Sequence, residues 1–159
     1  MDEIKFPRWD NLPPVDLYMD QVITYLNDKL SCVYFNNEKF VTSSMINNYV
    51  KTSIVKPPVK KHYTKYHMAY FIAVTILKKC YSMSEISKLI QIHTSMKDSS
   101  VEQAYDLFIS YFEDSLNQLF DSNQINNANS TLSSRQVLMK HVVSCVTNKI
   151  YSEYVLSEK

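Results

Sequence analysis

The chain contains no glycine among its 159 residues, and this absence restricts its possible folds more than any other feature. Average usage of about 7% would supply roughly eleven glycines in a chain of this length. P-loops, the GxGxxG dinucleotide turn and the GxSxG nucleophile elbow all need backbone without a Cβ, so none is expected here. Hairpin turns of the Asn-Gly and Asp-Gly kind are also missing. The sequence therefore favours helices joined by Asn, Ser and Pro turns over α/β enzymes or tight β-meanders.

Apolar residues recur at helical spacing in several segments, and this pattern predicts an all-α fold. The expected helices cover residues 16–30, 42–52, 64–80, 82–92, 99–120 and 134–156. Asp16 is expected to begin the first helix, where a carboxylate suits the helix dipole. The helix at 64–80 is apolar nearly all round, so it should be the buried central helix. Ser82 and Glu85 have the spacing of a capping box.

A chain of this length is typical of one domain, with or without an appendage. Prolines predict that residues 1–15 form an extended arm, which Trp9 pins to the body. Residues 16–95 are expected to form a helix-turn-helix DNA-binding region. Residues 96–159 are expected to form an antiparallel helical hairpin, with a homodimer as a possible role for it.

Charge is divided unevenly along a chain that is nearly neutral overall. From Lys39 to Ser84 there are eight lysines and no Asp or Glu, although the whole chain has 17 basic and 16 acidic residues. Subtracting these eight lysines leaves 9 basic and 16 acidic residues elsewhere. A local positive field of this kind indicates a polyanionic partner, whereas the simpler alternative is a solvated lysine-rich face.

Within this stretch, a short helix with one polar face precedes a basic connector around Pro57 and Pro58. Asn can pair with adenine, and Lys and Ser can bind phosphates, so the pattern suits double-stranded DNA. The candidate base-contacting residues are Ser44, Asn47, Asn48 and Lys51. The candidate phosphate-contacting residues are Ser43, Lys56, Lys60, Lys61, His62 and Lys65. Alternatively, the asparagines merely face solvent and the lysines confer solubility.

The order of these segments resembles the DNA-binding region of MerR-type transcription regulators. The matching residues are 46–51 for the recognition helix, 54–57 for the apolar-apolar-Lys-Pro step, 63–64 for the Tyr-Thr cap and 82–86 for the following helix. The resemblance implies a helix-turn-helix with a wing and a role in transcription regulation. The wing is several residues short and lacks its turn glycine, so residues 57–62 are expected to form a rigid strap. No metal- or drug-sensing motif follows.

Most of the first 90 residues also resemble a bacterial family known as domain of unknown function 1836. The segments that carry this resemblance are residues 7–10, 16–22, 45–51, 57–61 and 84–86. The family name implies no activity, but the resemblance makes the basic segment a family feature.

Metal, cofactor and catalytic sites are not expected. His62 and His67 are five residues apart, which is not a metal-ligand spacing, and His67 is expected on a helix surface or facing a phosphate. Glu113 and Asp114 are adjacent, so they do not share a helix face and are not expected to act as a catalytic pair. We therefore expect a protein that is not an enzyme.

The three cysteines, Cys32, Cys80 and Cys145, are odd in number and far apart. That pattern indicates a reducing compartment, and Cys80 and Cys145 are expected in the core. The first residues lack the apolar segment of a signal peptide, and the longest apolar run is too short to cross a membrane, so we expect a cytoplasmic protein. Two functions remain open: a DNA-binding regulator, or a helical protein-interaction module that binds an acidic protein.

Overall fold

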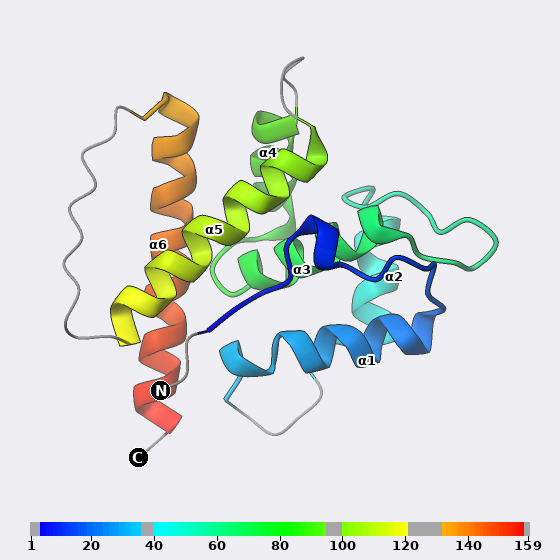
Figure 1. Ribbon diagram of the computed structural model, residues 1–159, viewed down its shortest axis with the longest axis horizontal. Coiled ribbons are helices and arrows are strands. Elements are labelled where there is room, and N and C mark those ends of the chain that lie inside the picture. Colours follow the sequence, from blue (N-terminus) through cyan, green and yellow to red (C-terminus); the bar gives the residue numbers. More distant parts are fainter. Residues whose placement is uncertain (1–3, 36–39, 95–99, 121–131, 158–159) are drawn as a thin grey trace.

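The computed structural model describes residues 4–35, 40–94, 100–120 and 132–157, and these form an all-α fold (Figure 1). The α-helices are α1 (Met19–Lys29), α2 (Ser43–Lys51), α3 (Lys65–Leu77), α4 (Met83–Thr94), α5 (Val101–Phe120) and α6 (Ser134–Ser157). Two short 3₁₀ turns, Trp9–Asn11 and Ser31–Val33, flank α1. The only β-pairing within the described residues consists of two isolated bridges. The predicted fold class is therefore confirmed.

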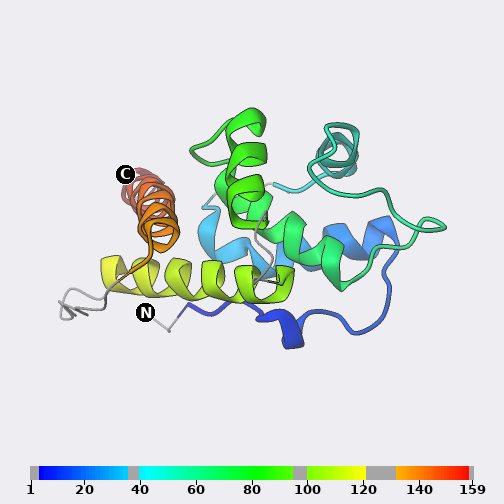
Figure 2. The ribbon, with the colours of Figure 1, turned by 90° about the horizontal axis from the view of Figure 1, so that it is seen from above.

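Helix α3 is the centre of the molecule. It lies between α1 and α5, and it contacts both (Figures 1 and 2). Its side chains are buried on nearly every side, including Phe71, Ile72 and Ile76, which have no exposed surface. A helix that is apolar all round must be covered all round, which is why this segment takes the central position.

Helix α1 begins at Met19, so the predicted start at Asp16 is wrong. The backbone of Leu17 pairs with that of Tyr63 in an antiparallel bridge, with N···O distances of 2.9 and 2.8 Å. The N–H and the carbonyl of Leu17 are therefore not available for helical hydrogen bonds. Tyr18 then precedes the helix, and its N–H donates to Oε1 of Gln21 at 2.9 Å.

Asn27 on α1 fixes the chain just before α2. Its Oδ1 accepts hydrogen bonds from the N–H groups of Phe40 and Val41 at 3.2 and 3.1 Å, and its Nδ2 donates to the Val41 carbonyl at 3.0 Å. One amide thus holds three backbone groups, and Val41 is buried. The long connector between α1 and α2 is therefore clamped where it enters α2.

Helices α5 and α6 run in the same direction, so the predicted antiparallel hairpin is wrong. Ser115 Oγ is 2.8 Å from Thr147 Oγ1, and one turn further on the Phe120 ring packs against Tyr151 and Tyr154. Figure 1 shows the two helices crossing with both C-terminal ends at the lower side. Residues 121–133 can span at most about 43 Å, which exceeds the roughly 30 Å length of α5. The connection is therefore long enough to return the chain to the start of α5, which a short loop could not do.

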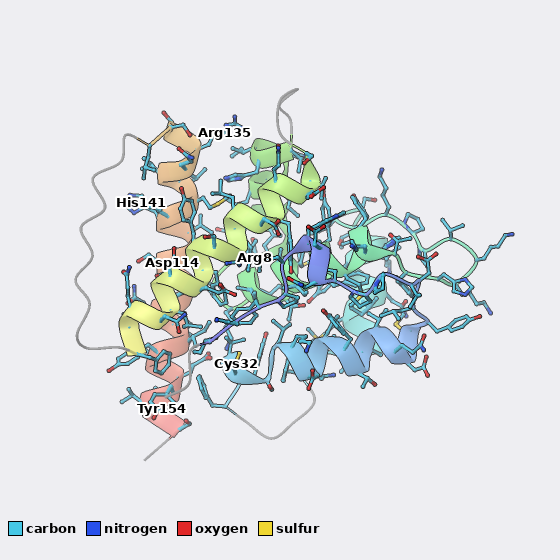
Figure 3. All side chains as sticks on the ribbon, viewed as in Figure 1. Arg8, Cys32, Asp114, Arg135, His141 and Tyr154 are labelled. Carbon is cyan, nitrogen blue, oxygen red and sulfur yellow. The ribbon has the colours of Figure 1, made fainter. Side chains whose placement is uncertain are left out.

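The N-terminal arm lies along α5. Glu113 accepts hydrogen bonds from the Phe6 N–H and from Arg8 Nη2, the latter at 2.7 Å. Figure 3 shows Arg8 beside α5. Tyr105 donates its hydroxyl hydrogen to the Pro7 carbonyl at 2.7 Å, and the Trp9 ring packs against the Tyr105 ring. Trp9 therefore pins the arm to the body, as predicted.

Candidate nucleic-acid interface

Helix α2 presents one polar face to solvent and one apolar face to the core. Ile46 and Tyr49 have no exposed surface and hold the helix against the body. Thr42 caps its start, because the Thr42 Oγ1 accepts a hydrogen bond from the Met45 N–H at 3.3 Å. All five predicted contact residues on the helix are exposed: Ser43, Ser44, Asn47, Asn48 and Lys51. The apolar stripe that buries one side of α2 therefore leaves this polar stripe accessible.

The end of α2 is a Schellman motif built without glycine. The Ser53 N–H donates to the Val50 carbonyl at 3.0 Å, and the Ile54 N–H donates to the Tyr49 carbonyl at 3.2 Å. Ser53 has a φ of 61°, in the left-handed region that glycine usually occupies. Ile54 and Val55 are then buried, so the chain leaves α2 along a defined path into the Pro57-Pro58 connector.

Residues 59–62 form a minimal hairpin, so the expected rigid strap is wrong. The backbones of Val59 and His62 exchange hydrogen bonds of 3.1 and 2.9 Å. Lys60 and Lys61 occupy the turn with φ values of 49° and 64°. Positive φ at both central residues is the signature of a type I′ turn, which normally contains Asn-Gly. The turn forms without glycine because the flanking residues are held in place on both sides.

Three contacts hold the hairpin on the body. The bridge between Leu17 and Tyr63 fixes its outgoing strand, and Tyr63 is buried against Phe71. His67 fixes its entry, because the His67 Nε2 lies 3.2 Å from the Pro57 carbonyl. The Thr64 N–H donates to the His67 Nδ1 at 2.9 Å, so the Nε2 carries the hydrogen that Pro57 accepts. His67 is therefore a buried structural residue, and its predicted surface position is wrong.

The predicted phosphate-contacting lysines carry no acidic partner. Among the described residues, no ion pair involves Lys51, Lys56, Lys60, Lys61 or Lys65. Lys56, Lys60 and Lys61 are exposed, and Lys65 is half-buried. The ammonium of Lys56 lies 5.4 Å from the centre of the Tyr66 ring. Within the described part of the chain, these lysines are therefore not held in ion pairs.

The last two lysines of the acid-free stretch behave differently. Lys79 is buried and pairs with Glu153 on α6, and its ammonium lies 4.1 Å from the centre of the Tyr34 ring. Lys78 is exposed, and its ammonium lies 5.5 Å from the centre of the Tyr49 ring. The acid-free stretch is therefore not a single basic surface.

Two residues at the hairpin were missed by the sequence reasoning. The exposed Tyr18 ring lies 4.4 Å from the His62 ring, and Val59 is 67% exposed. Tyr18 is 44 residues before His62, and only the bridge between Leu17 and Tyr63 brings the two rings together. Nothing in the local pattern around Tyr18 indicates this contact. Val59 could have been noticed as a β-branched residue next to two lysines.

No group of three or more His, Cys, Asp or Glu side chains that could hold a metal lies within the described residues. Cys145 is exposed, so its predicted core position is wrong, whereas Cys80 is half-buried and packs against the core. Burial raises the pKa of both Cys32 and Cys80 to about 11, so these two thiols are protonated at neutral pH. None of the described helices combines the length and apolarity needed to cross a bilayer.

Comparison with known proteins identifies a family. The family described as "Domain of unknown function (DUF1836)" matches residues 7–108, which include the arm, helices α1 to α4 and the first part of α5. Neither the curated proteins nor the solved structures contain a match. The matched range covers well over half of the chain and contains both the polar face of α2 and the lysine hairpin. The chain therefore belongs to the DUF1836 family.

Proposed function

We propose that this protein is a DNA-binding transcriptional regulator in which α2 is the recognition helix and the 59–62 hairpin is a shortened wing. The observation that carries the proposal is the exposure of the polar stripe of α2 together with two unpaired lysines on an anchored, strained turn. In this arrangement α1 and α2 form the helix-turn-helix, in a MerR-like order. The role is one of binding and involves no catalysis.

The polar stripe of α2 has the dimensions and chemistry to read bases. A helix of nine residues is about 14 Å long, and the major groove of about 12 Å width admits a helix. Asn47 and Asn48 can each offer an amide to adenine, Lys51 can donate to guanine, and Ser44 can pair with either base. Ser43 lies at the start of the helix, where a hydroxyl and free N–H groups suit a phosphate.

The hairpin supports the proposal through its backbone strain. A non-glycine residue in the left-handed region costs roughly 1–2 kcal/mol, and the hairpin contains two in succession. Glycine would remove that cost but would leave the turn without charge. Strained residues kept in a well-anchored turn are typical of functional sites. We infer that Lys60 and Lys61 are placed to contact phosphates, with Lys56, Lys65 and His62 alongside.

Fluorescence anisotropy with a labelled random duplex at low salt tests the proposal. We expect binding at micromolar protein, because contacts with four or five phosphates give affinity without sequence specificity and a salt slope of about −4. No binding of the wild type under these conditions would refute DNA binding. Competition by polyglutamate as strong as competition by duplex DNA would instead favour an acidic protein partner.

The role of α2 in sequence reading needs a separate experiment. Oligonucleotides selected on the wild type and on Asn47→Ala should differ at one or two positions, because a bidentate pair contributes about 1–3 kcal/mol of base discrimination. Thr24→Ala, on the exposed face of α1, is the control and should leave the selected sequence unchanged. Identical selected sequences for all three proteins would exclude Asn47 from base contact.

A further inference from the structure

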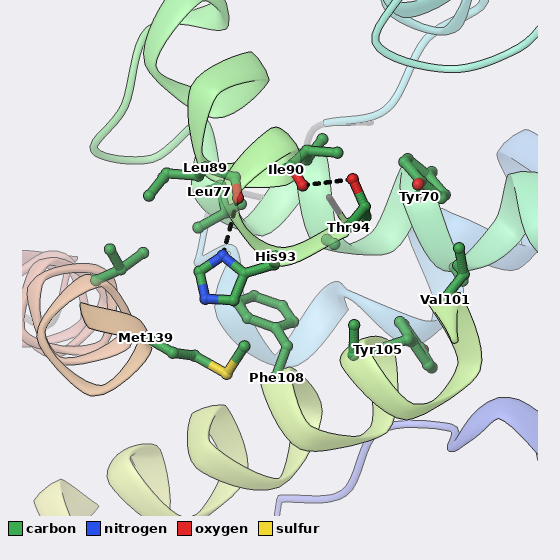
Figure 4. A pocket seen from close by; sticks show the side chains of 14 residues that line it. Tyr70, Leu77, Leu89, Ile90, His93, Thr94, Val101, Tyr105, Phe108 and Met139 are labelled. Carbon is green, nitrogen blue, oxygen red and sulfur yellow. Dashed lines mark hydrogen bonds between the residues drawn. The ribbon is translucent and has the colours of Figure 1, made fainter. Parts of the chain in front are cut away.

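An apolar cavity of about 100 Å³ lies where α3, α4, α5 and α6 meet (Figure 4). Three alanines make room for it, since Ala69 and Ala73 on α3 and Ala104 on α5 leave space that larger side chains would fill. Figure 4 shows Met139 extending from α6 towards Phe108, with the His93 ring beside them. The cavity is separate from the polar face of α2 and from the lysine hairpin.

The walls of the cavity are suited to a neutral ligand. None of the described residues that line it is an Asp, Glu, Lys or Arg, so a charged ligand would lose its hydration without gaining a partner among them. Three of the polar side chains in the wall donate their hydrogens to backbone carbonyls. His93 Nδ1 donates to Leu89 at 2.8 Å, Thr94 donates to Ile90 at 2.7 Å, and Tyr105 donates to Pro7 at 2.7 Å.

The walls are also rich in rings, including Tyr70, His93, Tyr105 and Phe108. Aromatic pairs in edge-to-face or offset geometry gain about 0.5–1.5 kcal/mol beyond the burial of their area. Met139 adds a flexible thioether, which adapts to irregular shapes and favours contact with ring edges. The surroundings therefore favour a planar ring over an aliphatic chain.

The size of the cavity limits the ligand to a single ring. A water molecule needs roughly 10–15 Å³, whereas apolar cavities of about 150 Å³ stay dry and bind benzene or xenon. The cavity, at about 100 Å³, is somewhat smaller than this. The Met139 side chain has several rotatable bonds, so it can move aside and enlarge the cavity. We propose that this cavity is a binding site for a small, neutral, single-ring aromatic molecule. The proposal is independent of DNA binding.

The test uses benzene as the probe and the methyl group of Met139 as the reporter, in full-length protein labelled with ¹³C at the methionine methyl groups. Benzene should shift the Met139 resonance saturably, while Met45 on α2 and Met19 on α1 should not move, because neither lines the cavity. The variant Met139→Leu assigns the resonance. A Met139 resonance that does not move up to the solubility limit of benzene would overturn the proposal.

Two controls locate the site and define its chemistry. Ala73→Leu fills the cavity and should weaken benzene binding at least about tenfold, whereas Gln118→Leu adds the same side chain on the exposed side of α5 and should change nothing. Undiminished binding in Ala73→Leu would show that benzene binds elsewhere. Benzoate, tested on the wild type, should leave Met139 unmoved. A benzoate shift equal to that of benzene would contradict the neutral character of the site.

Discussion

Two pairs of adjacent lysines in the same acid-free stretch have opposite surroundings. Lys60 and Lys61 stand on an exposed turn with positive φ, and neither forms an ion pair with a described carboxylate. Lys78 and Lys79 follow the end of the buried helix α3, where Lys79 is paired with Glu153 and covered by Tyr34. The sequence count treats these four charges as equal. The contacts show that Lys79 is held within the fold, whereas a partner for Lys60 and Lys61 is our proposal.

The largest expected effect is on the DNA affinity that we assign to Lys60 and Lys61. Reversing the charge at the hairpin with Lys60→Glu and Lys61→Glu should weaken duplex binding roughly tenfold to a hundredfold, because two phosphate contacts become repulsive. Anisotropy at low salt measures this change. Lys88→Glu with Lys140→Glu changes the net charge equally on α4 and α6 and should have a far smaller effect. Equal losses in the two double variants would show that only net charge matters.

The next effect concerns folding stability. Lys79→Ala removes the nearer cation from Glu153, which keeps its 3.7 Å pair with Lys149, and removes a stem that covers Tyr34, so the free energy of unfolding should fall by about 1–2 kcal/mol. Lys78→Ala removes an exposed side chain and should stay within about 0.5 kcal/mol of the wild type. Urea denaturation followed by circular dichroism gives both values. The comparison would fail if the two variants were equally stable.

A smaller effect of opposite sign is expected at the hairpin. Lys61→Gly should raise the free energy of unfolding by about 0.5–1 kcal/mol. Glycine adopts positive φ without steric cost, and the greater conformational entropy of glycine in the unfolded chain offsets only part of this stabilisation. The Lys61→Ala variant keeps the Cβ, so its free energy of unfolding should not rise above that of the wild type. Both variants lose one charge, so both should lose the same amount of duplex affinity. A Gly variant no more stable than the Ala variant would show that the turn is not strained.

A further prediction concerns the clamp on the connector before α2. Asn27→Asp keeps an oxygen that can accept from the Phe40 and Val41 N–H groups but loses the donor to the Val41 and Ile23 carbonyls, whereas Asn27→Ala loses all four bonds. Each lost bond costs about 0.5–1.5 kcal/mol, so Asp should lie between Ala and the wild type in denaturation experiments. If the Asp variant were no more stable than the Ala variant, the bonds from the Phe40 and Val41 N–H groups would not be the main source of the stability that Asn27 provides.

The helices were predictable from the sequence because their signals are local. The apolar repeat of α5, the capping box of Ser82 and Glu85 and the all-round apolar character of α3 each act within a few residues. The exposed stripe of α2 was predictable for the same reason, since the positions of Ile46 and Tyr49 determine which side chains remain outside.

The errors come from contacts between residues far apart in the chain. The start of α1 depends on the bridge from Leu17 to Tyr63, and the burial of His67 depends on the Pro57 carbonyl. The hairpin was excluded because its turn has no glycine, but tertiary anchoring on both sides stabilises a turn that local propensity disfavours. The direction of α6 depends on the length of its connection, which periodicity does not report.

The salt dependence of duplex binding tests the central claim most directly. Anisotropy titrations across a range of salt concentrations should give a wild-type slope of about −4, and Lys60→Gln with Lys61→Gln should reduce its magnitude by about two, because each lost phosphate contact removes roughly 0.9. The charge-matched variant Lys88→Gln with Lys140→Gln should retain the wild-type slope. A hairpin variant with an unchanged slope would contradict the claim that these two lysines contact DNA.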